Sequence, residues 1–186
     1  MKKTLACLLA LLLALMGAGL AEEAALYQSE HGYTLALPDE SWFRLDAQTW
    51  AQYADPLGEA FAEAGFTAET VETYASTGVE AFFTPGDVSA SIVVQRQEVS
   101  FSDENMRLTL DGLRQLYEGV MGASDYAETA FTAGGAQFEG CEYTLDGLPV
   151  MRLYLRFKDR NLSYIFTFQG IAPESVCALL EASAFA

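Results

Sequence analysis

The stretch from Phe131 to Phe168 constrains the fold more than any other part of this chain, because three short turns divide it into four β-rich segments. Gly134-Gly135 and Asp146-Gly147 suit two-residue hairpin loops, whose central residues need positive φ. The third turn contains Asp159-Arg160. Because arginine is strained at positive φ, the sequence favours a four-residue loop over 158–161 that keeps the same pairing. The stretch therefore predicts an antiparallel meander of four strands.

The three turns set one register, which sorts the side chains onto two faces. One of them, which we call the apolar face, has three rows of residues that lie side by side across the four strands. These rows are Phe131, Phe138, Leu155, Tyr164; Thr129, Gly140, Leu153, Phe166; and Ala127, Glu142, Met151, Phe168. A slip of one residue in any turn would place Arg152 and Arg156 among these apolar groups. Turn chemistry and hydrophobic pattern therefore predict the same register.

The opposite face, which we call the mixed face, combines tyrosine, arginine and glutamate. Its rows are Thr132, Gln137, Arg156, Ser163; Ala130, Glu139, Tyr154, Ile165; Glu128, Cys141, Arg152, Thr167; and Tyr126, Tyr143, Val150, Gln169. One interpretation is a solvated or partly covered face with cross-strand charge pairs. The other is a contact surface for a protein partner, since Tyr and Arg are enriched at interface hot spots. The predicted partner-binding residues are Tyr143, Arg152, Tyr154 and Arg156.

The first 21 residues have the order of a secretory signal peptide: two lysines, an apolar run from Leu5 to Met16, and small residues before Glu22. The run is too short for a spanning helix, and Cys7 lies within it, too early for a lipoprotein acceptor. We therefore expect cleavage after Ala21, a secreted or extracytoplasmic protein without a stable membrane anchor, and one domain over 22–186. Without the two lysines the net charge is about −18, which argues against nucleic acid and anionic membranes as partners.

Two cysteines remain after cleavage, Cys141 and Cys177. In an exported protein such a pair is compatible with a disulfide. Because Cys141 lies on the mixed face, this bond requires the C-terminal helix to pack on that face. The alternative is two separate small buried side chains.

The rest of the chain predicts further strands and helices of an α+β fold. Tyr27–Pro38 reads as a first strand and Trp42–Leu45 as a short return strand. Two more strands, Val79–Phe83 and Ala90–Val99, precede the clearest helix. That helix is capped by Ser102, ends near Gly122 and carries an apolar stripe that we expect to cover part of the apolar face; a last helix starts at Pro173. The predicted architecture is an antiparallel sheet with helices packed on its faces.

Residues 46–76 predict helices that are interrupted at Asp55-Pro56 and carry only acidic charges. A solvated helix surface explains these charges, and an acidic docking surface is the alternative. A further hypothesis is that this region binds a small ligand or a cation. The candidate ligand-binding residues are Trp50, Tyr53, Glu59 and Glu63.

The opening of the predicted mature chain contains a motif, Tyr27-x-Ser29-x-x-Gly32-Tyr33-x-Leu35-x-Leu37-Pro38-x-x-x-Trp42. This motif, with the capped central helix and the final strand and helix, resembles the PsbP-like superfamily. That group includes the PsbP extrinsic protein of photosystem II, bacterial DcrB-like proteins and a Ran-binding nuclear import factor family. The resemblance implies a sheet between helical layers, an α/β/α sandwich, and a role in binding or assembly rather than catalysis. No residue here matches a shared active site of that group.

Motifs for catalysis or metal binding are not evident in the sequence. His31 is the single histidine and precedes Gly32, which suits an exposed turn residue. We expect no cofactor, no metal and no enzymatic activity, with a carboxylate-dependent extracytoplasmic hydrolase as the alternative. Glu142 falls on the apolar face opposite Met151. One interpretation is that Glu142 lies near the edge of the sheet and reaches water. If it is buried instead, burial would raise the pKa of its carboxyl and make it a site candidate.

Overall fold

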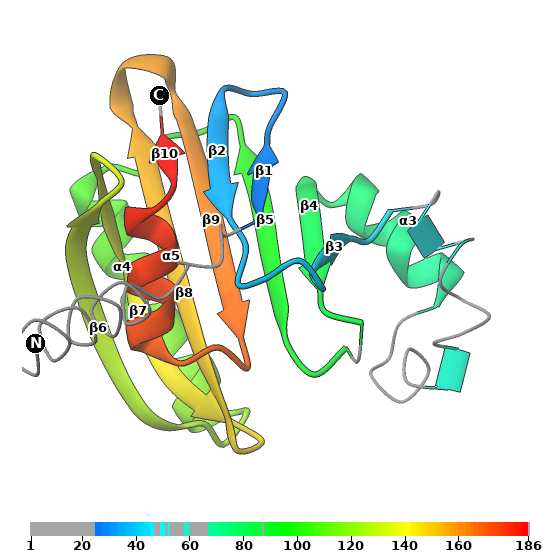
Figure 1. Ribbon diagram of the computed structural model, residues 1–186. Coiled ribbons are helices and arrows are strands. Elements are labelled where there is room, and N and C mark those ends of the chain that lie inside the picture. The colour runs from blue at the N-terminus through cyan, green and yellow to red at the C-terminus, as the bar shows by residue number, and fades with distance from the viewer. Residues whose placement is uncertain are drawn as a thin grey trace, which may run out of the picture.

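The computed structural model describes residues 25–46, 49–50, 52, 58–59, 67–86 and 88–185. In this part of the chain, two antiparallel sheets combine with helices, so the fold is α+β (Figure 1). The larger sheet contains, in order, β3 (Phe43–Arg44), β4 (Val79–Thr84), β5 (Ser91–Gln97), β9 (Leu162–Gln169), β8 (Leu148–Phe157), β7 (Ala136–Leu145) and β6 (Ser124–Ala133). The smaller sheet contains β1 (Leu26–Gln28), β2 (Tyr33–Ala36) and β10 (Ala184–Phe185). The helices are α3 (Ala68–Ser76), α4 (Asp103–Gly119) and α5 (Pro173–Glu181).

Strands β6 to β9 form the predicted meander, and its turns have the expected chemistry. Gly134 and Gly135 lie at φ 54° and 77°, and Asp146 and Gly147 at 52° and 79°, as two-residue hairpins require. The third turn is the predicted four-residue loop, with a 3-10 turn over Lys158–Arg160 and Asn161 in the left-handed region.

The predicted register is confirmed. Phe131 pairs with Phe138, Phe138 with Leu155, and Leu155 with Tyr164, and the next two rows of the apolar face follow in the same way. The outermost row of the mixed face differs from the prediction. The pairing of β6 shifts between Ser124 and Ala127, so Tyr126 is not the ladder partner of Tyr143.

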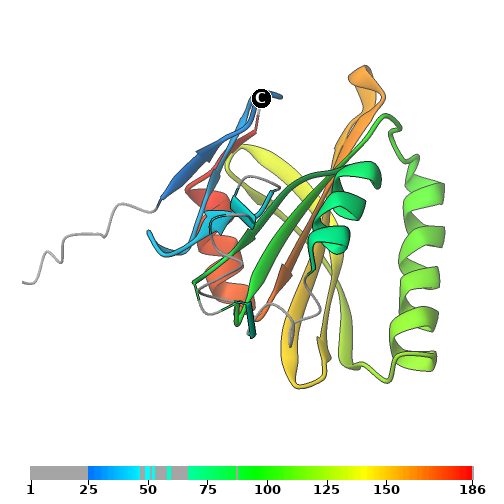
Figure 2. The ribbon, with the colours of Figure 1, turned by 90° about the vertical axis from the view of Figure 1, so that its right-hand side faces the viewer.

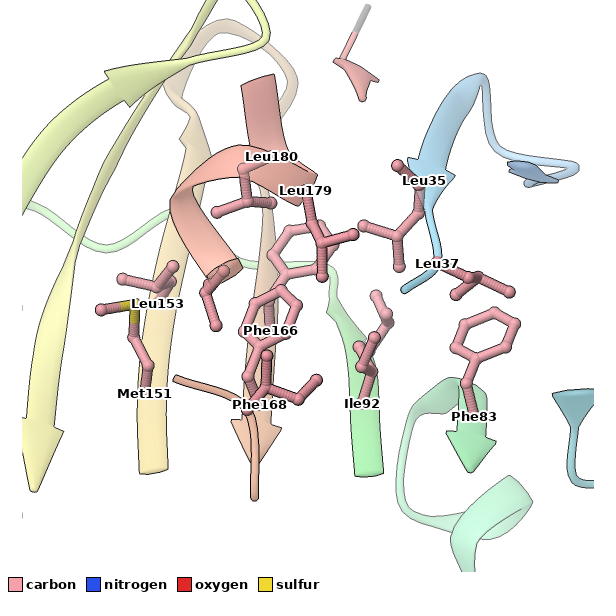
Figure 3. Close-up of a cluster of buried hydrophobic side chains, with 14 of the residues drawn as sticks. Leu35, Leu37, Phe83, Ile92, Met151, Leu153, Phe166, Phe168, Leu179 and Leu180 are labelled. Atoms are coloured by element: carbon pink, nitrogen blue, oxygen red, sulfur yellow. The ribbon is translucent and has the colours of Figure 1, made fainter. Parts of the chain in front are cut away.

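The two faces of the larger sheet are covered by different elements (Figure 2). α5 and the smaller sheet pack on the apolar face, where Leu179 and Leu180 lie over Phe166 and Leu153, and Leu35 approaches from β2 (Figure 3). α4 packs on the mixed face instead. The expectation that α4 covers the apolar face is therefore wrong, because the C-terminal helix and the β1–β2 hairpin already bury that face.

The predicted ends of the helices agree well with the structure. The Ser102 hydroxyl accepts a hydrogen bond from the Asn105 N–H and caps α4, and Pro173 stands in the first turn of α5. α4 ends at Gly119 rather than Gly122, with Val120 as its C-terminal cap.

The segment from Tyr27 to Pro38 is a hairpin rather than one strand. The Ser29 hydroxyl accepts a hydrogen bond from the His31 N–H, and Gly32 at φ 90° completes the turn between β1 and β2. The predicted return strand is β3, which pairs with β4 in the larger sheet and not with β2. The opening motif therefore brings the two sheets together.

Candidate functional site

The candidate site is the mixed face beneath α4, where the sequence places the partner-binding residues. Tyr143 and Tyr154 are 5% and 2% exposed. The Tyr117 ring of α4 stacks on Tyr143 at 4.1 Å between centroids, and Phe101 meets Tyr154 edge-on at 5.6 Å. Burial raises the pKa of the Tyr143 hydroxyl, so this group stays protonated. The helix thus covers the aromatic part of the mixed face.

Arg156 joins α4 to the sheet. Its Nη2 donates to both carboxylate oxygens of Glu139 at 2.7 Å, and its Nη1 donates to the Phe101 carbonyl and to Asp103, each at 2.9 Å. The side chain is 9% exposed. Burial opposes its charge, but Asp103 and Glu139 raise the pKa of the guanidinium overall. These charge-assisted bonds connect Arg156 of β8 both to β7 and to the residues at the start of α4, so they hold the start of the helix on the sheet.

Arg152 lies four residues earlier on the same strand and the same face, but its partners are neutral. Its Nε donates to the Tyr154 hydroxyl at 3.1 Å and its Nη1 to Thr167 Oγ1 at 3.2 Å. Its Nη2 reaches Gln95 Oε1 at 3.4 Å. The guanidinium also lies 5.7 Å from the centroid of the Tyr154 ring. Burial acts against its charge, yet the neighbouring tyrosines leave the pKa of Arg152 raised overall.

These positions contradict the prediction that the four residues form an open contact surface. Tyr143 and Tyr154 are buried under α4, and Arg156 is engaged with Glu139 and Asp103. Arg152, by contrast, keeps part of its surface in solvent and forms no ion pair with a carboxylate of the described residues. The alternative interpretation, a partly covered face with charge pairs, describes the mixed face correctly.

The possible disulfide between Cys141 and Cys177 is not formed. Cys141 is fully buried on the mixed face, whereas Cys177 lies on α5, which packs on the apolar face. The sheet separates the two thiols, and both are free. Burial raises the pKa of the Cys141 thiol, which keeps it protonated and unreactive.

An open depression of about 690 Å³ lies beside Arg156 and contains the grouping of carboxylates that the hydrolase alternative asks for. Asp103, Glu139 and Asp159 line it together with Arg156 and Lys158. Hydrogen bonds from Lys158 and Arg156 lower the pKa of Asp103, so this carboxyl is not suited to donate a proton as a general acid. The arrangement has the character of an ion-pair network that holds α4.

The acidic region is described only in part. Trp50 is partly buried and packs against the cluster of Leu45, Val71 and Phe82, which gives it a role in folding. Glu59 is exposed. Tyr53, Glu63 and the interruption at Asp55-Pro56 lie outside the described residues, as does the predicted signal peptide over 1–21.

Two further predictions concern single titratable residues. Glu142 is partly exposed, so the condition that would have made it a site candidate is not met. His31 is exposed in the turn between β1 and β2, as expected. Among the described residues, no group of three or more His, Cys, Asp or Glu side chains is placed to hold a metal ion.

Sequence reasoning missed a polar cluster between the two sheets. The Ser29 hydroxyl donates to the Glu80 carboxylate of β4, and Arg44 donates to the Glu80 carbonyl at 3.0 Å. Tyr33 lies beside Glu80, and burial raises the pKa of its hydroxyl. Ser29 and Tyr33 belong to the opening motif, which therefore has a structural role in fastening the first hairpin to the larger sheet.

None of the helices in the described part of the chain is long and apolar enough to cross a membrane.

Comparisons with known proteins identify no family for this chain. No protein-family model matches the chain, and no curated protein matches it. A solved structure that resembles it is that of PA94, a protein of unknown function from Pseudomonas aeruginosa. The two chains are 13% identical with a TM-score of 0.31, over 83% of this chain and 86% of that one. A TM-score this low carries no argument about function.

Proposed function

We propose that this protein is a secreted, non-enzymatic binding or assembly module that contacts a protein partner through the outer surface of α4. The observation that carries the proposal is the position of the exposed apolar side chains. Seven large hydrophobic residues are exposed in the described part of the chain, and five of them lie on α4 or next to its ends. These five are Val99, Leu108, Leu116, Val120 and Met121.

The five residues lie close enough in sequence to make one surface. Leu108, Leu116 and Val120 follow the four-residue spacing that keeps side chains on one side of a helix, and Gly112 occupies the position between the first two. Apart from the neighbouring backbone of α4 itself, no atom lies within 4 Å of where a Cβ of Gly112 would stand. A partner could therefore approach the helix backbone closely at this point.

A shallow depression continues this surface at the start of α4. It measures about 370 Å³ and is lined by Val99, Ser100, Phe101, Asn105, Leu108 and Thr109. Contiguous exposed apolar surface with a polar rim is typical of interaction sites. The excess of acidic residues favours a partner whose own contact surface is basic around an apolar centre.

The signal-peptide pattern and the resemblance of the opening motif to the PsbP-like superfamily support the same proposal. The first points to an exported protein, and the second to a role in binding or assembly. The finer PsbP-like sandwich is part of this proposal, alongside the α+β fold described above.

The proposal is tested by the double substitution Leu108→Glu and Leu116→Glu. Both side chains point to solvent at 55% and 43% exposure, so the fold should survive while recovery of the partner in a crosslinking pull-down from the native cell envelope falls at least tenfold. Leu26→Glu is the matched control, because Leu26 is 64% exposed on β1 and belongs to no such cluster. Equal recovery with the double variant and with the control would refute the role of α4.

A further inference from the structure

Arg152 differs from the other basic residues that the structure describes, because none of the described carboxylates lies within 4.0 Å of its guanidinium. The others each have such a partner; they are Arg44, Arg96, Arg107, Arg114, Arg156, Lys158 and Arg160. The chain has 26 acidic and 10 basic residues, so a shortage of acids does not explain the exception. A partly buried charge without a counter-ion costs a folded protein free energy and needs a reason.

The hydrogen bonds of Arg152 use only part of its capacity. A guanidinium has five N–H donors. Three of them are directed at Tyr154, Thr167 and Gln95, and the bond to Gln95 is long at 3.4 Å. Two N–H groups therefore remain for a further acceptor, and the three existing bonds, made to strands β8, β9 and β5, hold the guanidinium in a fixed plane.

The burial of its neighbours shows from which side Arg152 can be reached. Cys141 and Tyr154, which lie under α4, are 0% and 2% exposed. Thr167 and Gln95, toward β9 and β5, are partly exposed, and so is Arg152. In Figure 1, α4 lies behind β6, β7 and β8, while α3 lies at the opposite end of the sheet beside β4. The site is therefore open where the mixed face leaves the cover of α4.

We propose that Arg152 binds the carboxylate group of a ligand at this position. The two remaining N–H donors, one on Nη1 and one on Nη2, equal in number the two oxygens of a carboxylate, the group that a planar guanidinium binds best. A monoanion suits a single arginine in a chain of net charge −16, because a phosphate dianion would meet more repulsion from the rest of the molecule. Partial burial strengthens the pairing relative to the same contact in water.

The test is an NMR titration of the full chain that follows the Nε–Hε signal of Arg152. Sodium acetate is added at constant ionic strength, with sodium chloride as the control salt. Acetate should shift the Arg152 signal along a saturable curve, whereas the signal of Arg114, which is bound to Glu128 at 2.8 Å, should not follow that curve. A linear shift that chloride reproduces, together with the same result for the peptide acid described below, would overturn the proposal.

A variant tests the proposed geometry. Arg152→Lys keeps the charge but loses the planar fork, and should weaken acetate binding at least tenfold; unchanged affinity would contradict the proposed geometry.

A second pair of ligands tests the carboxylate itself. An acetylated dipeptide with a free carboxylate is compared with its amide. Binding of the acid but not the amide, with or without acetate binding, supports the site and separates protein carboxylates from small ones. Failure of both acetate and the peptide acid would overturn it. The α4 surface is not involved, so the outcome is independent of the Leu108 and Leu116 variants.

Discussion

Two arginines of the mixed face, Arg156 and Arg152, differ in the partners that surround their guanidinium groups. Arg156 is held by Glu139, Asp103 and a backbone carbonyl at the start of α4. Arg152 lies on the same strand, β8, where the mixed face is no longer covered by α4. It donates hydrogen bonds to Tyr154, Thr167 and Gln95, and forms no ion pair with a carboxylate of the described residues. Residue type and sheet face are the same, so the difference comes from the neighbouring strands and from α4. One arginine serves the fold, and the other has capacity left for a ligand.

The largest effect that tests this comparison is expected from Arg156→Ala. The variant leaves Glu139 and Asp103 without their shared partner and frees the start of α4. Because both carboxylates keep some access to water, we expect the free energy of unfolding to fall by about 2–3 kcal/mol. Urea denaturation measures this. Arg114→Ala is the control: its pair with Glu128 is 47% and 44% exposed and should contribute less than about 1 kcal/mol.

A smaller effect is expected when the other arginine is replaced by an apolar side chain of similar length. Arg152→Met removes a charge that has no counter-ion among the described residues, so no described carboxylate loses an ion-pair partner. The free energy of unfolding should change by less than about 1 kcal/mol in either direction. A loss equal to that of Arg156→Met in the same urea experiment would show that both arginines serve the fold, and the comparison would fail.

The smallest effect concerns pH. Lys158 and Arg156 lower the pKa of Asp103 in the folded protein from its usual value of 3.8. The stability from this group is therefore complete above about pH 4 and is lost as pH falls below 3.8 toward the folded-state pKa. Asp103→Asn should flatten the pH dependence of the thermal midpoint in that acid range and leave its slope near pH 7 unchanged. A parallel shift at all pH values would indicate a role other than charge.

The meander could be predicted because its information is local. Gly134-Gly135 and Asp146-Gly147 set their hairpins from their own backbone preferences, and the period-two pattern checks the result. The first hairpin was missed although its signals are also local. Ser29 and Gly32, three residues apart, form the turn that divides the expected single strand.

Which helix covers which face could not be predicted, because that choice depends on contacts distant in sequence. The stripe of α4, with Met106 and Leu110 buried, would suit either face by its periodicity alone. Instead, α5 and β2 occupy the apolar face. Ser183, which follows α5, connects them: its hydroxyl accepts from the Ala36 N–H of β2 at 2.9 Å and donates to the Leu179 carbonyl of α5 at 2.7 Å. That placement also buried the predicted contact residues and separated Cys141 from Cys177.

The surroundings of Arg152 were likewise beyond the sequence pattern. Its row predicts Cys141 and Thr167 as neighbours but not Gln95, which comes from β5 across the β5–β9 pair. Whether a carboxylate lies near Arg152 depends on which strands the folded sheet places beside it, and the sequence pattern does not give that. The same holds for the exposed apolar side chains of α4, since exposure is known only once the opposite side of the helix is buried.

The central claim is that α4 lies on the mixed face of the meander, and one measurement tests it most directly. Nuclear Overhauser contacts between the ring protons of Tyr117 and Tyr143 in the full chain should be strong, because the two rings stack with their centroids 4.1 Å apart. If these contacts are absent while Tyr117 instead contacts Phe138 or Leu153 on the apolar face, the account is contradicted.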